Sequence, residues 1–277
     1  MEEHSDSEIV IVRPRRKGIY LLPNLLTTGC LFSGFYAIVA AIDKNFAPAG
    51  IAVFVAMLFD TLDGRIARAT HTESTFGKEY DSLADMVAFG VAPAIVAYQW
   101  GVVRIAEYGR AWGRFGWLAA FFYAVAVALR LARFNARSAG ADKRYFEGLP
   151  SPSGAAVVAA FIWFSSGWHE PGLPGLIAAF VITASAGALM VSSFSYPSFK
   201  QFNLDRRIKF AYMLIVPLFF VLIAADPATM LLSIFSTYAL SAPLLWVGRR
   251  IRRKNRTGPA PVPAAAIFMK SRRFMQV

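Results

Sequence analysis

Residues 46–69 of the 277-residue chain read FAPAGIAVFVAMLFDTLDGRIARA. The run is apolar for long enough to cross a bilayer as a helix, because a span needs about 20 mostly apolar residues. Near its end it carries Asp60 and Asp63. Charged groups inside a span are costly and mark functional sites. The stretch therefore predicts a membrane helix with a polar site near one end.

Further stretches of the chain are also apolar over the length of a span. Backbone groups in hydrocarbon must be satisfied internally, and these runs do not alternate with the period of barrel strands, so helices are predicted. Within the third run, Gly90 and Pro93 predict a kink. We predict an all-α integral membrane protein with about eight transmembrane helices, at residues 19–42, 46–69, 79–103, 113–137, 150–168, 173–194, 208–225 and 228–248.

The composition is apolar and basic at once. Hydrophobic residues make up 56% of the chain and charged residues only 17%, against about 25% charged in soluble domains. The net charge of +12 first suggests nucleic acid or an anionic membrane surface as a partner. With both termini in the cytoplasm, the cytoplasmic side holds all 29 lysines and arginines except Lys44, Arg104, Arg110 and Arg114.

That distribution follows the positive-inside rule, so the charge serves topology and no nucleic acid is needed. We expect a multi-pass protein of the plasma membrane with both termini and the active site cytoplasmic. Residues 1–18 form a cytoplasmic N-terminal segment, and the basic tail 249–277 either anchors the topology or attracts anionic lipid. The single cysteine, Cys30, excludes a disulfide scaffold and a thiolate zinc site.

Two adjacent predicted helices carry four aspartates between them. Asp60 and Asp63 are spaced i,i+3 and Asp81 and Asp85 are spaced i,i+4, so each pair shares a helix face. The connection 69–76 is short, which predicts that the two helices are antiparallel neighbours. The four carboxylates would then converge near the cytoplasmic end of the bundle.

Four carboxylates at one place repel one another unless cations lie between them. Oxygen ligands without cysteine or histidine select hard cations, Mg²⁺ or Mn²⁺. Two ions neutralise four charges better than one, and ion pairs about 3.5–4 Å apart serve phosphoryl displacement. Gly64 leaves room for a phosphate and Arg68 suits one. A cation- or proton-coupled transporter is the alternative, since transporters also bury carboxylates, although near the midplane.

The spacing of these residues resembles a known signature. The pattern is Asp60-x-x-Asp63-Gly64-x-x-Ala67-Arg68, eight residues, then Gly77-x-x-x-Asp81-x-x-x-Asp85, and it resembles that of the CDP-alcohol phosphatidyltransferases. Enzymes of that family transfer a phosphatidyl group from a CDP-linked lipid to an alcohol and release CMP. The resemblance implies a six-helix catalytic core at 19–194, followed by two additional helices at 195–248.

The same resemblance implies roles for single residues. Asp60, Asp63, Asp81 and Asp85 would bind two divalent cations, and Asp85 would also be the general base. Pro23-Asn24-x-x-Thr27 is similar to a family element near the cytidine, although it also fits a helix started by proline. The implied contacts to the CDP-lipid are Asn24, Thr27, Asp63, Gly64, Arg68 and Ser74.

Three further stretches, 81–93, 130–135 and 146–152, resemble the phosphatidylserine synthase branch of the family. This implies CDP-diacylglycerol and L-serine as substrates; glycerol 3-phosphate or inositol as acceptor is the alternative. Arg130 and Arg133 would meet the carboxylate of an amino-acid acceptor or a lipid phosphate, or else anchor the topology. Asn135 would hold the acceptor's ammonium or cap the helix end. An exposed helix face of small residues would support a homodimer.

Overall fold

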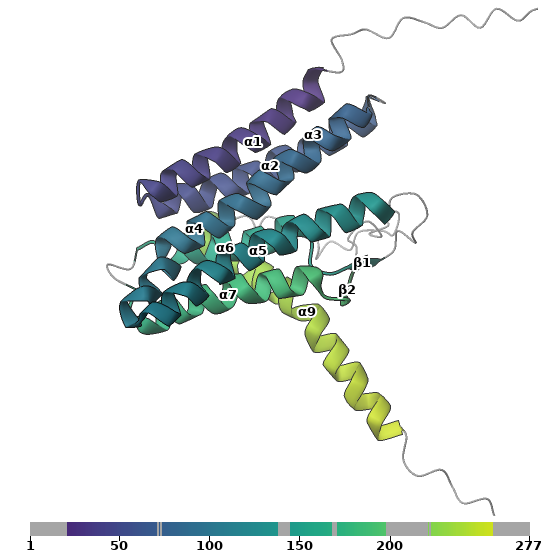
Figure 1. The fold of residues 1–277 in the computed structure, drawn as a ribbon. Coiled ribbons are helices and arrows are strands. Elements are labelled where there is room, and N and C mark those ends of the chain that lie inside the picture. The colour runs from purple at the N-terminus through teal and green to yellow at the C-terminus, as the bar shows by residue number, and fades with distance from the viewer. Residues whose placement is uncertain are drawn as a thin grey trace, which may run out of the picture.

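The computed structural model describes residues 21–70, 72, 74–137, 145–167, 171–197, 221 and 223–256, and within them the chain is almost entirely helical (Figure 1). The all-α prediction is confirmed. The predicted segment 1–18, most of the predicted span 208–225 and the tail beyond residue 256 lie outside the described residues. The helices and strands are α1 Leu21–Ile42, α2 Phe46–Ala69, α3 Thr75–Asp85, α4 Ala92–Trp100, α5 Arg110–Arg137, β1 Tyr145–Glu147, α6 Ser151–Ser165, α7 Leu173–Val191, β2 Ser195–Pro197 and α9 Pro227–Arg256.

Membrane-spanning length is reached by six helical stretches in the described part of the chain. They are Leu22–Ile42, Phe46–Ala69, Thr75–Tyr108, Trp112–Ala136, Leu173–Val191 and Pro227–Gly248. The predicted span at 150–168 is the shorter helix α6, of 15 residues. A helix of that length reaches about 22 Å, less than the bilayer's hydrocarbon core of about 30 Å. The protein is therefore a multi-pass membrane protein with one apolar helix that is too short to cross alone.

The third span is not one regular helix. Between α3 and α4 lies a π-helical segment, Met86–Val91, which we call the π segment. A 3₁₀ segment, Val102–Tyr108, follows α4. The predicted irregularity near Gly90 and Pro93 is thus present, as a widened turn. Such turns occur inside α-helices mostly at functional sites.

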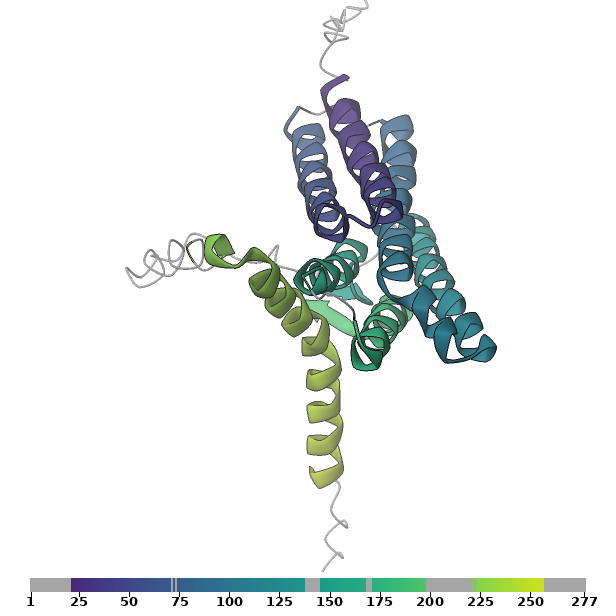
Figure 2. The same cartoon turned by 90° about the vertical axis from the view of Figure 1, so that its left-hand side faces the viewer.

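Helix α1 packs against both α2 and α3, whereas α2 hardly touches α3. Figure 2 shows the ribbon of α1 between the other two. Helices α2 and α3 therefore lie near each other beside α1 with few direct backbone contacts. Small residues let α1 approach closely: a Cβ on Gly34 would lie 2.6 Å from Cα of Ala88 in the π segment.

Helix α9 is attached through the short strand pair. Strands β1 and β2 are antiparallel, with Phe146 opposite Tyr196. The Tyr196 hydroxyl donates to the carbonyl of Ala239 at 2.8 Å, four residues before Pro243 inside α9. Burial raises the pKa of Tyr196 to about 12, so its hydroxyl stays protonated at neutral pH. The C-terminal half of α9 projects away from the other helices (Figures 1 and 2).

Candidate active site

Three of the four predicted metal ligands form a compact group. One carboxylate oxygen from each of Asp60, Asp63 and Asp81 lies within 4.8 Å of the other two. Asp60 and Asp63 come from the C-terminal part of α2, and Asp81 comes from α3. We call these three residues the aspartate triad. Clustered carboxylate oxygens are the donor set that divalent hard cations prefer, so the residues fit Mg²⁺ or Mn²⁺.

Asp63 is the buried member of the triad, with 4% of its surface exposed. The Thr27 hydroxyl on α1 donates to its Oδ2 at 2.8 Å. The same hydroxyl lies 3.1 Å from the carbonyl oxygen of Pro23, so its single proton serves two acceptors. Helix α1 therefore fixes the orientation of one carboxylate. Outer contacts of this kind orient metal ligands and tune their affinity.

Asp85 lies one turn beyond Asp81 on α3, at the deep side of the triad. Its Oδ1 is buried and has no hydrogen-bond partner among the described residues. It lies within electrostatic range of all three triad carboxylates and of Arg130 on α5. A buried polar atom without a partner is costly, so Oδ1 is suited to a ligand that the chain itself does not supply.

Arg130 on α5 lies within electrostatic range of Asp85. Its Nη1 donates to the Ser151 hydroxyl at the start of α6, at 2.9 Å. Its Nε is buried and has no partner among the described residues. Asp85 and Arg130 thus each carry one buried polar atom without a partner among the described residues. A guanidinium in this setting suits a carboxylate or a phosphate.

The other two predicted acceptor residues make different contacts. Asn135 donates from Nδ2 to the Ser82 hydroxyl on α3 at 3.0 Å. Arg133 forms an exposed ion pair with Glu147 of β1. Asn135 is therefore directed toward α3, whereas Arg130 is bonded to the start of α6 and Arg133 to the strand pair.

The residues predicted to contact the nucleotide lie at two places near the ends of α2 and α3. Ser74 caps α3, because its hydroxyl accepts from the backbone N–H of Gly77 at 2.9 Å. A Cβ on Gly77 would lie 3.1 Å from that hydroxyl oxygen and 3.5 Å from Oδ1 of Asn24. Asn24 and Ser74 are thereby brought together. On α2, a Cβ on Gly64 would lie 3.5 Å from Nη1 of Arg68.

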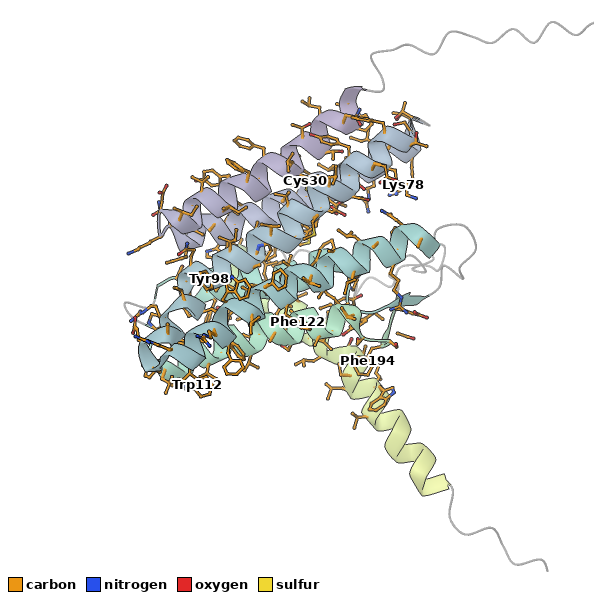
Figure 3. All side chains as sticks on the ribbon, in the orientation of Figure 1. Cys30, Lys78, Tyr98, Trp112, Phe122 and Phe194 are labelled. Atoms are coloured by element: carbon orange, nitrogen blue, oxygen red, sulfur yellow. The ribbon has the colours of Figure 1, made fainter. Side chains whose placement is uncertain are left out.

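Sequence reasoning missed several contacts around the site. Tyr80, the residue before Asp81, shares a hydrogen bond of 2.9 Å with Thr28 and so joins α3 to α1. Ser151 lies in a stretch whose likeness to the family was visible, but nothing local indicated its contact with Arg130. Cys30, labelled in Figure 3, lies on α1 within electrostatic range of all four aspartates. It has the appearance of an ordinary core residue in the sequence.

Comparison with known proteins agrees with this geometry. The sequence model of the CDP-alcohol phosphatidyltransferase family matches residues 20–192. The chain is 32% identical over 241 residues to a CDP-diacylglycerol–serine O-phosphatidyltransferase of Helicobacter pylori. The aligned residues cover 86% of this chain and 98% of the relative. It is 36% identical over 181 residues to the enzyme of that name from Mycobacterium tuberculosis, covering 57% of this chain and 59% of the relative.

An archaetidylserine synthase of Methanothermobacter thermautotrophicus is 36% identical over 182 residues, which cover 64% of this chain and 69% of the relative. The matched family region begins at α1 and ends just after α7, so it contains the aspartate triad, Asp85 and Arg130. The resemblance inferred from the aspartate pattern is confirmed. This chain belongs to the CDP-alcohol phosphatidyltransferase family.

Proposed function

We propose that this chain is a CDP-diacylglycerol–serine O-phosphatidyltransferase, which makes phosphatidylserine and CMP from CDP-diacylglycerol and L-serine. The observation that carries the proposal is that Asp85 and Arg130, which lie within electrostatic range of each other and of the triad, each have a buried polar atom with no partner among the described residues. An acceptor with a hydroxyl to deprotonate and a carboxylate to hold requires that pair of groups. The name of the Helicobacter pylori relative supports the same acceptor.

The proposal assigns the donor lipid to the triad side of the site. Asp60, Asp63, Asp81 and Asp85 would hold two divalent cations, Mg²⁺ or Mn²⁺. Such ions, when bound, supply positive charge against the pyrophosphate of CDP-diacylglycerol. The open helix face at Gly64 lets the nucleotide approach α2. The side chains proposed to contact it are Asn24, Thr27, Arg68 and Ser74.

The transfer step exchanges one P–O bond for another. Asp85 accepts the proton of the serine hydroxyl, and the serine oxygen forms a bond to the lipid-side phosphorus. The bond from that phosphorus to the CMP oxygen breaks, and CMP leaves with the electron pair. Arg130 holds the serine carboxylate, so that the hydroxyl lies near Asp85. Positioning and charge stabilisation supply most of the rate in such transfers.

Arg130 is assigned the centre of the acceptor site, because its Nε has no partner among the described residues. Asn135 and Arg133 are proposed to line the sides of the acceptor site. Asn135 reaches Ser82, which lies between Asp81 and Asp85 on α3. Arg133 holds β1 through Glu147, and β1 leads directly to Ser151 and α6.

We also propose a setting for the enzyme. The positive-inside distribution supports a plasma-membrane protein with both termini and the active site cytoplasmic. The family match ends at residue 192, which supports a six-helix core at 19–194 with the two helices of 195–248 as an addition. A homodimer through an exposed face of small residues completes the proposal.

The deciding experiment reconstitutes the purified protein in liposomes that contain CDP-diacylglycerol. Labelled L-serine, glycerol 3-phosphate or inositol is supplied with Mg²⁺ or Mn²⁺, and CMP and labelled lipid are measured. We expect both products with serine and neither with the other two. If products form with glycerol 3-phosphate or inositol and not with serine, serine is not the acceptor. Cation flux across the vesicles without CMP release under any acceptor would identify a transporter.

A further inference from the structure

Next to the π segment, Pro93 leaves the Phe89 carbonyl without its usual helical donor. The N–H of Ala92 donates to the carbonyl of Val87, five residues back. The next residue is Pro93, which has no N–H. In an α-helix, residue 93 would donate to the carbonyl of Phe89. That carbonyl therefore needs a donor from outside its own helix.

Tyr123 of α5 supplies that donor. Its hydroxyl donates to the Phe89 carbonyl at 2.9 Å. Both residues are fully buried, with 0% of their surface exposed. Water therefore has no access to replace the bond, and a buried carbonyl left unsatisfied is costly. The tyrosine hydroxyl is the group that completes the widened turn.

The π segment is also closely packed on both sides. Gly34 of α1 lets the two backbones meet, since a Cβ there would lie 2.6 Å from Cα of Ala88. On the other side, a Cβ on Gly90 would lie 3.2 Å from a methyl carbon of Val127 on α5. A segment held in this way has little freedom to shift along its axis.

The same contact links the two polar residues of the proposed acceptor site. Tyr123, Val127 and Arg130 are spaced i, i+4 and i+7, so they lie along one face of α5. Phe89 follows Asp85 by four residues, one turn along the opposing helix. The Tyr123–Phe89 bond therefore joins the same two helical segments that carry Arg130 and Asp85, one to two turns away from those residues.

We propose that Tyr123 is a positioning residue for phosphatidyl transfer: its hydrogen bond to Phe89 sets the register of α3 against α5 and so holds Asp85 opposite Arg130. This inference rests on the proposed function. It adds Tyr123, which lies two turns from Arg130 on α5 and acts through its bond to Phe89.

The test compares Tyr123→Phe with Tyr196→Phe, reconstituted in liposomes. Each variant loses one buried hydroxyl that donates to a carbonyl four residues before a proline. For Tyr123 this is the carbonyl of Phe89, before Pro93. For Tyr196 it is the carbonyl of Ala239, before Pro243. Each keeps its aromatic ring. The control therefore reports what the loss of such a bond does to stability alone. Kinetic constants are determined per folded enzyme, with thermal unfolding measured in parallel.

We expect both variants to unfold at lower temperature, but only Tyr123→Phe to lose turnover. Its kcat falls by about 10- to 100-fold, because displacements of about 1 Å at reacting groups cost that much. Its KM for CDP-diacylglycerol changes less than its kcat, because Asp60 and Asp63 on α2 keep their positions. Equal kcat in the Tyr123→Phe variant and the parent, or equal losses in the two variants, would overturn the inference.

A second variant, Pro93→Ala, tests the register without weakening the fold. The new N–H competes with Tyr123 for the Phe89 carbonyl and favours an ordinary α-turn in place of the π segment. We expect unchanged or higher thermal stability with lower kcat. Parent-like kcat in this variant contradicts the inference. The parent's own CMP release with serine tests the proposed function separately, since the variants are compared with the parent under whichever acceptor it uses.

Discussion

The hydroxyl of Thr27 on α1 donates a hydrogen bond of 2.8 Å to Oδ2 of Asp63 on α2. This bond joins the two helices at the buried edge of the aspartate triad. The Thr27 hydroxyl does not bond Oδ1, the other carboxylate oxygen of Asp63. Thr27 thereby orients a proposed metal ligand, in addition to the contact with the CDP-lipid that the family resemblance implies for it.

Replacing Thr27 tests this orientation. Thr27→Val keeps the shape of the side chain and removes the donor, so Asp63 is no longer held. We expect the affinity for Mn²⁺ to fall by about 10- to 100-fold, as for other partners of metal ligands. Thr27→Ser retains a hydroxyl and should restore most of the affinity. Mn²⁺ titration followed by electron paramagnetic resonance measures both, and identical curves for the valine and serine variants would refute the role.

Replacing Asp85 tests the proposed base. Asp85→Asn removes the proton acceptor but preserves size and most polar contacts. We expect turnover to be lost while binding of CDP-diacylglycerol is partly retained, because the triad remains. CMP release and lipid binding are measured on the same preparation, with the exposed Asp43→Asn variant as a control. Undiminished CMP release by the Asp85→Asn enzyme removes Asp85 from the base role.

Replacing members of the triad tests the metal site itself. Asp60→Ala and Asp63→Ala each leave two oxygens of the group that lies within 4.8 Å. We expect both to lose affinity for Mn²⁺ and for the nucleotide together, because the cation would neutralise the pyrophosphate. Glu79→Ala, an exposed acid on α3, is the control. Calorimetric titrations that match the parent's would exclude these aspartates as ligands.

The two arginines of α5 should differ in their effect on the acceptor. Arg130→Gln removes a partly buried cation, and a hydrogen bond to a charged group contributes about 1.5–3 kcal/mol, or about 10- to 100-fold in binding. We therefore expect a KM for serine raised by that factor and a KM for CDP-diacylglycerol near the parent's. Arg133→Gln breaks an exposed pair with Glu147, whose contribution to stability is about 0–1 kcal/mol.

Steady-state kinetics with serine varied at saturating CDP-diacylglycerol measures this difference. A smaller increase in the KM for serine is expected for Arg133→Gln, through the wall formed by β1. If the two variants have the same KM for serine, Arg130 does not hold the centre of the acceptor site.

Local sequence was sufficient for the helices and for the spacing of the acids. Four predicted spans match α1, α2, α5 and α7 within three residues, and the span at 228–248 matches the apolar part of α9, Pro227–Gly248. A bilayer demands a minimum apolar length that can be read directly from the sequence. The pairs Asp60/Asp63 and Asp81/Asp85 share helix faces for the same local reason. The irregular turn near Pro93 was also foreseeable, since proline lacks a donor wherever it stands.

Contacts between distant parts of the chain were not foreseeable. Nothing near Thr27 in the sequence indicates Asp63, and nothing near Tyr123 indicates Phe89. The short connection between α2 and α3 predicted neighbouring helices, but not that α1 would pack against both while α2 and α3 make few direct contacts. Such pairings depend on close packing of small residues such as Gly34 and on buried polar atoms finding donors, and both arise only when several helices assemble. The sequence alone determined where the spans lie and which aspartates share a helix face, because both follow from apolar length and helix periodicity. The tertiary structure was needed to decide which aspartates come together and which side chains hold them, because those contacts form when several helices pack.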